Sequence, residues 1–538
     1  MEKEFNITGT CIPSMHYMVD TSNKLDKTIK LINKKKYFII NRPRQYGKTT
    51  TFFLLNNKLK ETEDYLPIKI SFEGIGDLIF ENEQSFSKTF LEIVERNLSF
   101  NCKELAAFLE ERESKVDNLN GLSKVISEFI IKANKKVVLM IDEVDKSSNN
   151  QLFLSFLGML RNKYLLRNEE QDYTFHSVIL AGVHDVKSLK VKIRPEEEQK
   201  YNSPWNIASD FDVDMSFSVE EIKTMLEDYI SNKHVKLEMD YFAERLYFYT
   251  SGYPFLVSKL CKIIDEKIMV EDELKWEKEY MDLAVKEILK DDNTNFDSLI
   301  KNIENNKELY DFVEKIVLNN EIISFIKTDS IINIGSVYGI LKEENGNCKI
   351  NNKIYEQLIY DHMMMKVIRK DKKSTMSQYN YKSNFINENG DLDIKKILVK
   401  FQQFMHIKKS TKCNQELKPN HSYYIEADGR LLFLAFISPI INGTGFAFKE
   451  VQGGEEKRFD IVITYNKKMY ILELKLWRGE EYHKNGIKQL AQYLEQYELE
   501  KGYLLIFDFR KIEKSSGKVE ESIVSFGEKN KSIFEVYV

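Results

Sequence analysis

Four short apolar runs in the first half of the chain, separated by longer amphipathic stretches, constrain the fold most strongly. The runs are Tyr37–Ile40, Pro67–Phe72, Val137–Ile141 and Ser177–Ala181. Continuous apolar runs that alternate with helical patterns are typical of parallel strands with helices on both faces, because both sides of each strand are then buried. Residues 1–250 are therefore predicted to form an α/β domain with a parallel sheet.

Composition excludes several other classes of protein. The 538 residues correspond to about three to four domains at roughly 150 residues each. Hydrophobic residues make up 42% of the chain, which is enough for packed cores and excludes a largely disordered protein. The 79 basic and 84 acidic residues leave a net charge of −5, so any surface that binds nucleic acid must be local.

Cysteines and hydropathy predict the cellular setting. The five cysteines are far apart and form no C-x-x-C pair, which argues against a disulfide scaffold and indicates a reducing compartment. The acidic N-terminus lacks the basic flank and apolar run of a signal peptide. The longest apolar run, Leu431–Ile441, is shorter than the roughly 18 residues of a membrane span. We expect a cytoplasmic protein with no membrane partner.

Changes of pattern divide the rest of the chain. Residues 251–375 are expected to form a helical lid and a winged-helix-like region, because a hairpin signal, Asn345-Gly346, follows helical patterns. Such a region either binds DNA or only packs on the first domain. Residues 376–415 are interpreted as a linker and a connecting helix. Residues 416–538 are predicted to form an α/β domain with a mixed sheet, since two alternating runs precede a helical pattern and another strand.

The first chemical motif directly follows the first apolar run. Residues 42–50 read R-P-R-Q-Y-G-K-T-T and lead into a helical pattern. Backbone N–H groups at a helix N-terminus bind phosphate, and Gly47 lets the backbone approach it closely. In such a loop Lys48 reaches the β- and γ-phosphates and the Thr49 hydroxyl ligates Mg²⁺. Arg42 stands where these loops usually have glycine.

Two carboxylates end the third apolar run. In a phosphate-loop NTPase, Asp142 holds the Mg²⁺ shell and Glu143 polarises the attacking water. The alternative is a buried strand whose acidic end only caps a loop. Paired with the G-K-T motif, the nucleotide site is the favoured interpretation.

Other polar side chains are weaker candidates for phosphate contacts. His184 follows the fourth apolar run and is either a γ-phosphate sensor or a structural residue. Arg161, Arg167 and Arg194 are all candidates for a phosphate-contacting arginine, and the sequence does not choose among them.

The loop resembles the R-P-R-[RQ]-[FY]-G-K-[ST] loop of the bacterial and archaeal AAA-ATPase-like family, which also has arginine in place of the first glycine. His16–Asp20, Ile141–Asp145 and Ser251–Leu256 resemble the lead-in segment, metal strand and lid of that family, so the resemblance covers roughly residues 1–360. It implies ATP and Mg²⁺ as cofactors and leaves a homo-oligomer open. The implied nucleotide-binding residues are Arg44, Gln45, Tyr46, Gly47, Lys48, Thr49, Thr50 and Asp142.

The second chemical motif is a set of charged residues on two predicted strands near the C-terminus. Asp460 lies at the start of one strand, and Glu473 and Lys475 project from one face of its partner, because strand side chains alternate. Two carboxylates bind Mg²⁺ or Mn²⁺, and the lysine orients or activates a metal-bound water. The alternative is a cross-strand ion pair on a solvated sheet.

This arrangement resembles the PD-(D/E)XK nuclease superfamily over roughly residues 420–515. Asp460, Glu473 and Lys475 match its D…E-x-K core, and Gln489 and Tyr493 match the Q-x-x-x-Y helix of some branches. The upstream helical glutamate of the superfamily is either Glu426 or Glu450.

Together the two motifs predict an ATPase that gates a metal-dependent nuclease, with DNA as the expected partner. The alternative is a regulatory NTPase switch, of AAA or STAND type, whose C-terminal domain binds nucleic acid or a partner without cutting.

Overall fold

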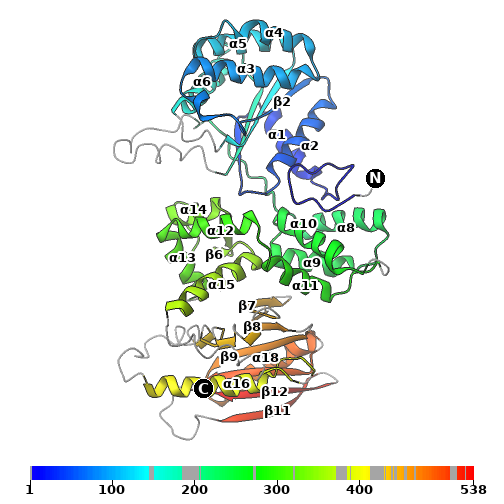
Figure 1. The fold of residues 1–538 in the computed structure, drawn as a ribbon, viewed down its shortest axis with the longest axis vertical. Helices are drawn as coiled ribbons and strands as arrows, with labels where there is room; N and C mark the ends of the chain where they lie inside the picture. The colour runs from blue at the N-terminus through cyan, green and yellow to red at the C-terminus, as the bar shows by residue number, and fades with distance from the viewer. Residues whose placement is uncertain are drawn as a thin grey trace.

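The computed structural model arranges the chain in three tiers (Figure 1). It describes residues 3–144, 151–183, 205, 207–270, 274–318, 321–370, 385–387, 389–411, most of 429–441, 445–453, 457–465, 468–497, 499–508, 518–526 and 529–538. Between 429 and 441 it leaves out residues 431, 435, 438 and 439. Among the residues described, no helix is both long and apolar enough to cross a membrane.

The first tier is built on a parallel sheet, as predicted. Its strands are β1 (Phe38–Asn41), β2 (Tyr65–Ser71), β3 (Lys136–Asp142) and β4 (Ser177–Gly182). They run in the order β1-β4-β3-β2, and every pair is parallel. All of β4 and all but the first residue of β3 are buried, which explains their continuous apolar runs.

Helices cover this sheet. They are α1 (Ser22–Asn33), α2 (Lys48–Lys60), α3 (Glu83–Ser99), α4 (Lys103–Glu113), α5 (Leu119–Ala133) and α6 (Gln151–Asn168). The carboxyl ends of β1 and β3 lie at one edge of the sheet, on either side of β4. This edge therefore carries both halves of the first predicted site.

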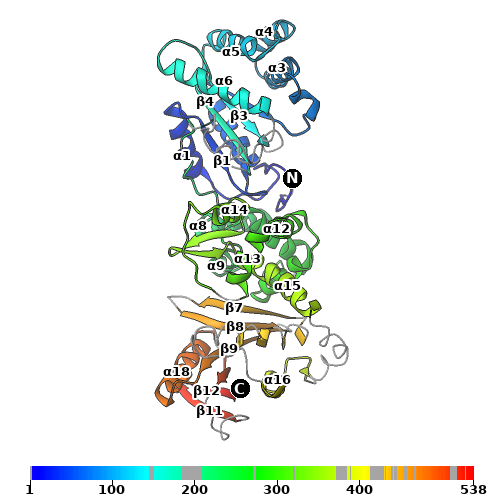
Figure 2. The same ribbon diagram turned by 90° about the vertical axis from the view of Figure 1, so that its left-hand side faces the viewer.

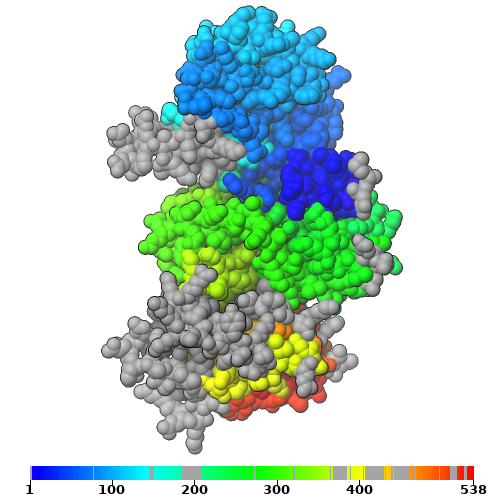
Figure 3. Space-filling view, viewed as in Figure 1, coloured from blue at the N-terminus to red at the C-terminus, as the bar shows by residue number. Residues whose placement is uncertain are grey.

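The middle tier begins with four helices. They are α8 (Val219–Lys233), α9 (Met239–Thr250), α10 (Pro254–Ile263) and α11 (Glu279–Leu289). Ser218 and Glu221 form a capping box at the start of α8. The N-terminal segment lies at the junction of the two tiers (Figure 3). It is tied to the helices by ion pairs between Lys3 and Asp228 and between Glu4 and Lys262.

Gly252, between α9 and α10, has no room for a side chain. Its φ is +71°, and a Cβ would lie 1.9 Å from the carbonyl oxygen of Phe217. We expect Gly252→Ala to lower the free energy of unfolding by more than about 3 kcal/mol, because a left-handed backbone alone costs about 1–2 kcal/mol and the clash with backbone adds to it. Gly346→Ala is the matched control: its φ is +78° but no atom lies within 4 Å of the added Cβ. Thermal melts in which the two variants shift equally would contradict this expectation.

The second half of the middle tier contains α12 (Thr294–Glu304), α13 (Lys307–Val317), α14 (Ser330–Val337), β5 (Leu341–Glu344), β6 (Asn347–Ile350) and α15 (Lys353–Lys370). The turn between β5 and β6 has positive φ at Asn345 and Gly346, so the hairpin prediction is confirmed. Helix α14 has no basic residue. Just beyond it, a Cβ on Gly339 would lie 2.6 Å from Cγ of Pro43, so this region packs on the loop after β1.

The third tier is an α/β domain with a mixed sheet, as predicted. Its strands are β7 (Gly445–Gly453), β8 (Lys457–Tyr465), β9 (Lys468–Leu476), β10 (Lys501–Phe507), β11 (Val519–Phe526) and β12 (Lys529–Tyr537). The order is β11-β12-β10-β9-β8-β7. Strand β10 is parallel to both β9 and β12, whereas the remaining pairs are antiparallel.

Helices α18 (Glu480–Gln496) and α16 (Ile394–Thr411) lie on opposite sides of this sheet (Figure 2). The Gln402 side chain of α16 donates to the carbonyl oxygen of Tyr537 at 2.6 Å. The helix that the sequence placed in the 376–415 connection therefore packs on the third tier. Within the apolar run Leu431–Ile441, Phe433, Leu434 and Ile437 are helical and buried in the core.

Candidate nucleotide site and carboxylate cluster

The segment between β1 and α2 has the backbone of a phosphate-binding loop. Strand β1 ends at Asn41 and α2 begins at Lys48. Gln45 and Gly47 have φ of +55° and +78°, so the loop turns through two left-handed residues. The first N–H groups of α2 have no carbonyl partner within the helix and are available to an anion. Strand, loop and helix thus follow one another as predicted.

Thr49 and Asp142 meet at the carboxyl edge of the sheet. The Thr49 hydroxyl donates to Oδ2 of Asp142 at 2.8 Å, and Oδ1 of Asp142 accepts from the backbone N–H of Glu143 at 3.0 Å. Asp142 is 3% exposed. A hydroxyl and a carboxylate at this distance are oxygen ligands of the kind that Mg²⁺ prefers, so the pair fits that ion. Glu143 follows with a φ of +54°.

Lys48 lies inside the loop. Its ammonium donates to the carbonyl oxygens of Arg42 and Pro43, both at 2.9 Å, and the residue is 7% exposed. Two backbone carbonyls thus hold the cation at the centre of the loop. A phosphate bound by the N–H groups of α2 would meet this ammonium at short range.

Arg42, which replaces the usual glycine, points out of the loop. Its guanidinium donates to the carbonyl oxygens of Asn41, Phe211 and Val213 and lies 5.6 Å from the centre of the Phe211 ring. Burial lowers the pKa of Arg42, although nearby acidic groups oppose the effect. Arg42 therefore ties the loop to the segment before α8.

The side chains of the loop also reach the segment before α8 and the start of α10. The Tyr46 hydroxyl is 2.7 Å from Oγ of Ser216, and its ring packs edge-on against Tyr253 with centroids 4.6 Å apart. The Tyr253 hydroxyl in turn donates to the carbonyl oxygen of Arg44 at 2.5 Å. The exposed side chain of Arg44 makes no contribution to this contact. Nothing in the sequence pattern indicated that Tyr253 contacts the loop.

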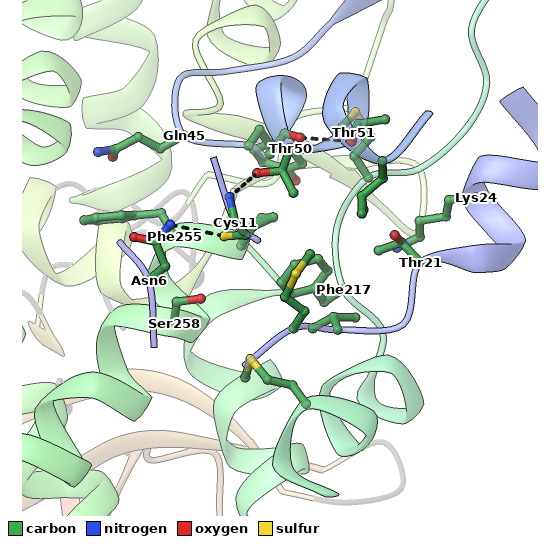
Figure 4. A pocket seen from close by; sticks show the side chains of 18 of the residues that line it. Asn6, Cys11, Thr21, Lys24, Gln45, Thr50, Thr51, Phe217, Phe255 and Ser258 are labelled. Atoms are coloured by element: carbon green, nitrogen blue, oxygen red, sulfur yellow. Dashed lines mark hydrogen bonds between the residues drawn. The ribbon is translucent and has the colours of Figure 1, made fainter. Parts of the chain in front are cut away.

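A pocket of about 350 Å³ opens between the loop, the N-terminal segment and helix α10 (Figure 4). Its walls include Asn6, Cys11, Met18, Val19, Gln45, Gly47, Thr50, Thr51, Phe217, Pro254, Phe255 and Ser258. The backbone N–H of Cys11 donates to Oγ1 of Thr50 at 3.1 Å, which fixes the N-terminal segment against α2. The predicted lead-in segment, His16–Asp20, thus forms part of the pocket wall. Residues 6–9 and 11 also line the pocket, but no sequence motif predicted this.

One candidate phosphate-contacting arginine is placed elsewhere. Arg167 donates to the carbonyl oxygens of Phe175, His176 and Lys35. Lys35 precedes β1 and His176 precedes β4, so Arg167 lies at the edge opposite the loop and its candidacy is wrong. Arg161 lies on α6. His184, Asp145 and Arg194 are outside the described residues.

The second predicted cluster also comes together. Lys475 Nζ is 3.0 Å from Oε1 of Glu473, and Oδ2 of Asp460 accepts from the backbone N–H of Leu474 at 2.8 Å. Both predicted carboxylates and the lysine therefore share one region of β8 and β9. The alternative, a cross-strand ion pair on a solvated sheet, is wrong about the solvent, because Glu473 is only 1% exposed, although Glu473 does pair with Lys475.

Burial makes Glu473 unusual. Burial and the charge of Asp460 raise its pKa to about 8, although Lys475 opposes the effect. Burial opposes the charge on Lys475, but the two carboxylates outweigh it and raise the pKa of the ammonium. Oε2 of Glu473 has no hydrogen-bond partner among the described residues. A buried carboxylate oxygen without a donor, beside a second carboxylate, fits a divalent cation.

A third acidic ligand is not among the described side chains, where no group of three or more His, Cys, Asp or Glu residues converges. Glu426 lies outside the described residues, and Glu450 lies in β7 with its side chain outside them. Helix α18 covers the cluster: a Cβ on Gly486 would lie 3.6 Å from Cε of Lys475. Gln489 donates to the Tyr493 hydroxyl at 2.6 Å.

Sequence reasoning missed one charged neighbour of the cluster. The guanidinium of Arg430 is 3.3 Å from Oδ1 of Asp460. Arg430 is followed by the apolar run that suggested only core packing, and its spacing from Asp460 matches no motif.

Two features together define the phosphate-loop ATPases. A glycine–lysine–threonine loop follows the first strand of a parallel sheet, and the threonine is bonded to an aspartate at the end of β3, which β4 separates from β1. The model of the AAA-like domain matches residues 12–361, more than half of the chain. The chain belongs to this AAA-like domain family.

Solved structures show distant likenesses. The Walker-type ATPase of Pyrococcus abyssi is 11% identical with a TM-score of 0.46, and the match covers 66% of this chain and 99% of that one. The ORC2 protein of Aeropyrum pernix is 11% identical with a TM-score of 0.37, covering 67% and 98%. RuvB of Thermotoga maritima is 16% identical with a TM-score of 0.34, covering 64% and 96%. No curated protein matches the chain.

Proposed function

We propose that this protein binds and hydrolyses ATP with Mg²⁺, and that its C-terminal domain is a metal-dependent nuclease that cuts DNA under control of the nucleotide. The Thr49–Asp142 contact carries the first part of the proposal. The buried cluster of Asp460, Glu473 and Lys475 carries the second. The domains are proposed as an ATPase domain at 1–250, a lid region at 251–375 and a C-terminal domain that includes helix α16.

In the ATPase site, each residue has one task. Backbone N–H groups from Gln45 to Thr50 cradle the phosphates, and Lys48 neutralises their charge. Thr49 and Asp142 hold Mg²⁺ directly or through water. Glu143 polarises the attacking water. The base enters the pocket between the N-terminal segment and α10, whose wall is mainly apolar.

In the nuclease site, Asp460 and Glu473 would hold Mg²⁺ or Mn²⁺, which supplies a more acidic water and stabilises charge on the phosphate. The Lys475 ammonium lies beside Glu473 and can orient that water by donating a hydrogen bond to it. Gln489 on α18 extends the polar face. Burial and the charge of Asp460 raise the pKa of Glu473, and a metal would bind its ionised form, so metal affinity is expected to rise with pH.

A contact between the middle and third tiers supports the control by nucleotide. Helix α10 lines the nucleotide pocket, and α11 packs beside it. A small cavity of about 40 Å³ is lined by Glu279, Asp282 and Lys286 of α11 and by Thr464, Lys468 and Met469 of the β8–β9 hairpin. The same hairpin carries Asp460 and Glu473. A movement of the lid on nucleotide binding would therefore press on the strands of the nuclease site.

We expect Glu143→Gln to slow ATP hydrolysis about 100-fold or more while nucleotide affinity changes little, because only the water-polarising carboxylate is lost. Hydrolysis is measured by phosphate release and affinity by a fluorescent ATP analogue. Glu170→Gln is the matched control, since Glu170 is exposed and shares the left-handed backbone of Glu143, with φ of +59° against +54°. A Glu143→Gln variant that hydrolyses ATP at the normal rate would remove Glu143 from the mechanism.

Cleavage of plasmid DNA with Mg²⁺ or Mn²⁺ tests the whole proposal. If the nucleotide controls the nuclease, wild-type protein should cleave the plasmid at different rates with and without ATP. Because Glu143→Gln hydrolyses ATP slowly, its cleavage rate should keep the value of the ATP-bound protein for longer. Equal rates in all conditions leave a nuclease without nucleotide control. Absence of cleavage with both metals favours the second candidate, a regulatory ATPase whose C-terminal domain only binds. The pairing of both carboxylates with cations is the observation that favours it.

A further inference from the structure

Arg430 contacts one of the two carboxylates of the cluster directly. Its guanidinium lies 3.3 Å from Oδ1 of Asp460, and the two side chains are only 9% and 16% exposed. Water screens such a pair weakly, so the attraction is stronger than between surface charges. The carboxylate that is proposed to ligate a metal is therefore already held by a cation of this chain.

Close packing fixes the position of Arg430. A Cβ on the preceding residue, Gly429, would lie 2.3 Å from Cζ of Phe507 and 2.6 Å from its Cε2, so only glycine allows this approach. Phe507 ends β10 and pairs with Leu476, the residue that follows Lys475 on β9. On the other side of Arg430, Phe433 is fully buried and packs against Phe401 of α16 with ring centroids 5.2 Å apart. Packing on both sides holds the guanidinium next to Asp460.

The four carboxylate oxygens of Asp460 and Glu473 differ in their hydrogen-bond and ion-pair partners. Oδ2 of Asp460 accepts from the Leu474 N–H, and Oδ1 faces Arg430. Oε1 of Glu473 faces Lys475, whereas Oε2 has no hydrogen-bond partner among the described residues. A divalent cation held by Asp460 and Glu473 would share the Asp460 carboxylate with Arg430. Like charges that share one carboxylate repel strongly in a buried site.

We propose that Arg430 is a positioning residue that competes with the divalent metal for Asp460. In the metal-free site it holds the carboxylate beside Leu474 and compensates its charge. When the metal binds, the guanidinium leaves Asp460. This inference rests on the proposed metal site, and it predicts that the native site binds metal more weakly than the same carboxylates do without Arg430.

The test is a calorimetric titration of the full chain with Mn²⁺ in the absence of nucleotide. Arg430→Gln removes the competing charge and keeps an amide that can bond to Asp460. We expect it to bind Mn²⁺ on the order of tenfold more tightly than wild type at the site that Asp460→Asn abolishes. Arg430→Lys keeps the charge and is expected to bind close to wild type. A merely structural role for Arg430 would weaken metal binding and not strengthen it.

Arg167→Gln is the matched control, because it removes the same charge from an arginine that lies in the first tier and is held there by carbonyl groups. It is expected to lower the melting temperature without changing Mn²⁺ affinity. Affinity in Arg430→Gln that is equal to or weaker than wild type overturns the competition. A wild-type chain with no Mn²⁺ site sensitive to Asp460→Asn overturns the proposed metal site as well, so the two failures are distinguishable.

A second measurement covers the case in which Arg430→Gln does not fold. In wild-type protein labelled with ¹⁵N-arginine, the guanidinium signal that Arg430→Lys removes is expected to shift when Mg²⁺ is added, because the guanidinium loses its contact with Asp460. The Arg167 signal should stay in place. An unchanged Arg430 signal at saturating Mg²⁺ overturns the proposal.

Discussion

Lys48→Ala is expected to weaken ATP binding by at least about 100-fold, or about 3 kcal/mol. Lys48 is the buried cation at the centre of the loop, and it donates to the carbonyl oxygens of Arg42 and Pro43. In the nucleotide complex the ammonium bonds to phosphate oxygens instead, and bonds between charged groups are about twice as strong as neutral ones. Alanine leaves the phosphate charge without this partner.

The measurement is a titration with a fluorescent ATP analogue in the presence of Mg²⁺. Lys60→Ala is the control, because Lys60 ends the same helix and is exposed. It removes an equal charge and should leave affinity within about twofold of wild type, since exposed charges at this distance are screened by salt. A thermal melt shows whether Lys48→Ala is folded. Unchanged affinity in a folded Lys48→Ala protein would exclude the loop as the nucleotide site.

Asp460→Asn is expected to reduce metal-dependent cleavage by at least about 1,000-fold, because the metal supplies both the activated water and the stabilisation of phosphate charge. It should also abolish the rise in melting temperature caused by Mn²⁺. In chelator the variant should melt close to wild type. Asparagine keeps an oxygen for the N–H of Leu474 and removes the charge that disfavours ionised Glu473, which offsets the lost attraction to Arg430.

Glu500→Gln is the control for this second prediction. Glu500 is exposed, lies in the same domain and loses the same charge, so cleavage and metal stabilisation should be unchanged. If Asp460→Asn cleaved DNA as fast as wild type, the activity would belong to another site. If it melted far below wild type in chelator, the Arg430–Asp460 pair would be mainly structural.

Much of the local structure was predictable because it depends on neighbours in the chain. The four apolar runs became the four parallel strands with ends displaced by at most two residues. Ser218 and Glu221 form a capping box, and Asn345-Gly346 forms the hairpin turn. Side-chain alternation correctly placed Glu473 and Lys475 together. In each case the signal is the period or turn chemistry of a few consecutive residues.

Other features were beyond a pattern of consecutive residues. The order β1-β4-β3-β2 places β4 between the two strands of the nucleotide site, although it is the last of the four in sequence. Arg167 was a candidate phosphate ligand until the sheet placed it at the opposite edge. The connecting helix, α16, belongs with the third tier because Gln402 and Phe401 find their partners there.

The sequence by itself determined which chemistry is present: a lysine and threonine at the start of a helix, carboxylates at the end of a strand, and two acids with a lysine on paired strands. These groups lie on regular elements whose geometry follows from local preferences. Only the tertiary structure decided what surrounds them. Tyr253 bonds to the carbonyl of a residue 209 positions away, and Arg430 reaches Asp460 across 30 positions. Such contacts depend on how whole elements pack, and packing is set by the shapes of many buried side chains at once rather than by any short motif.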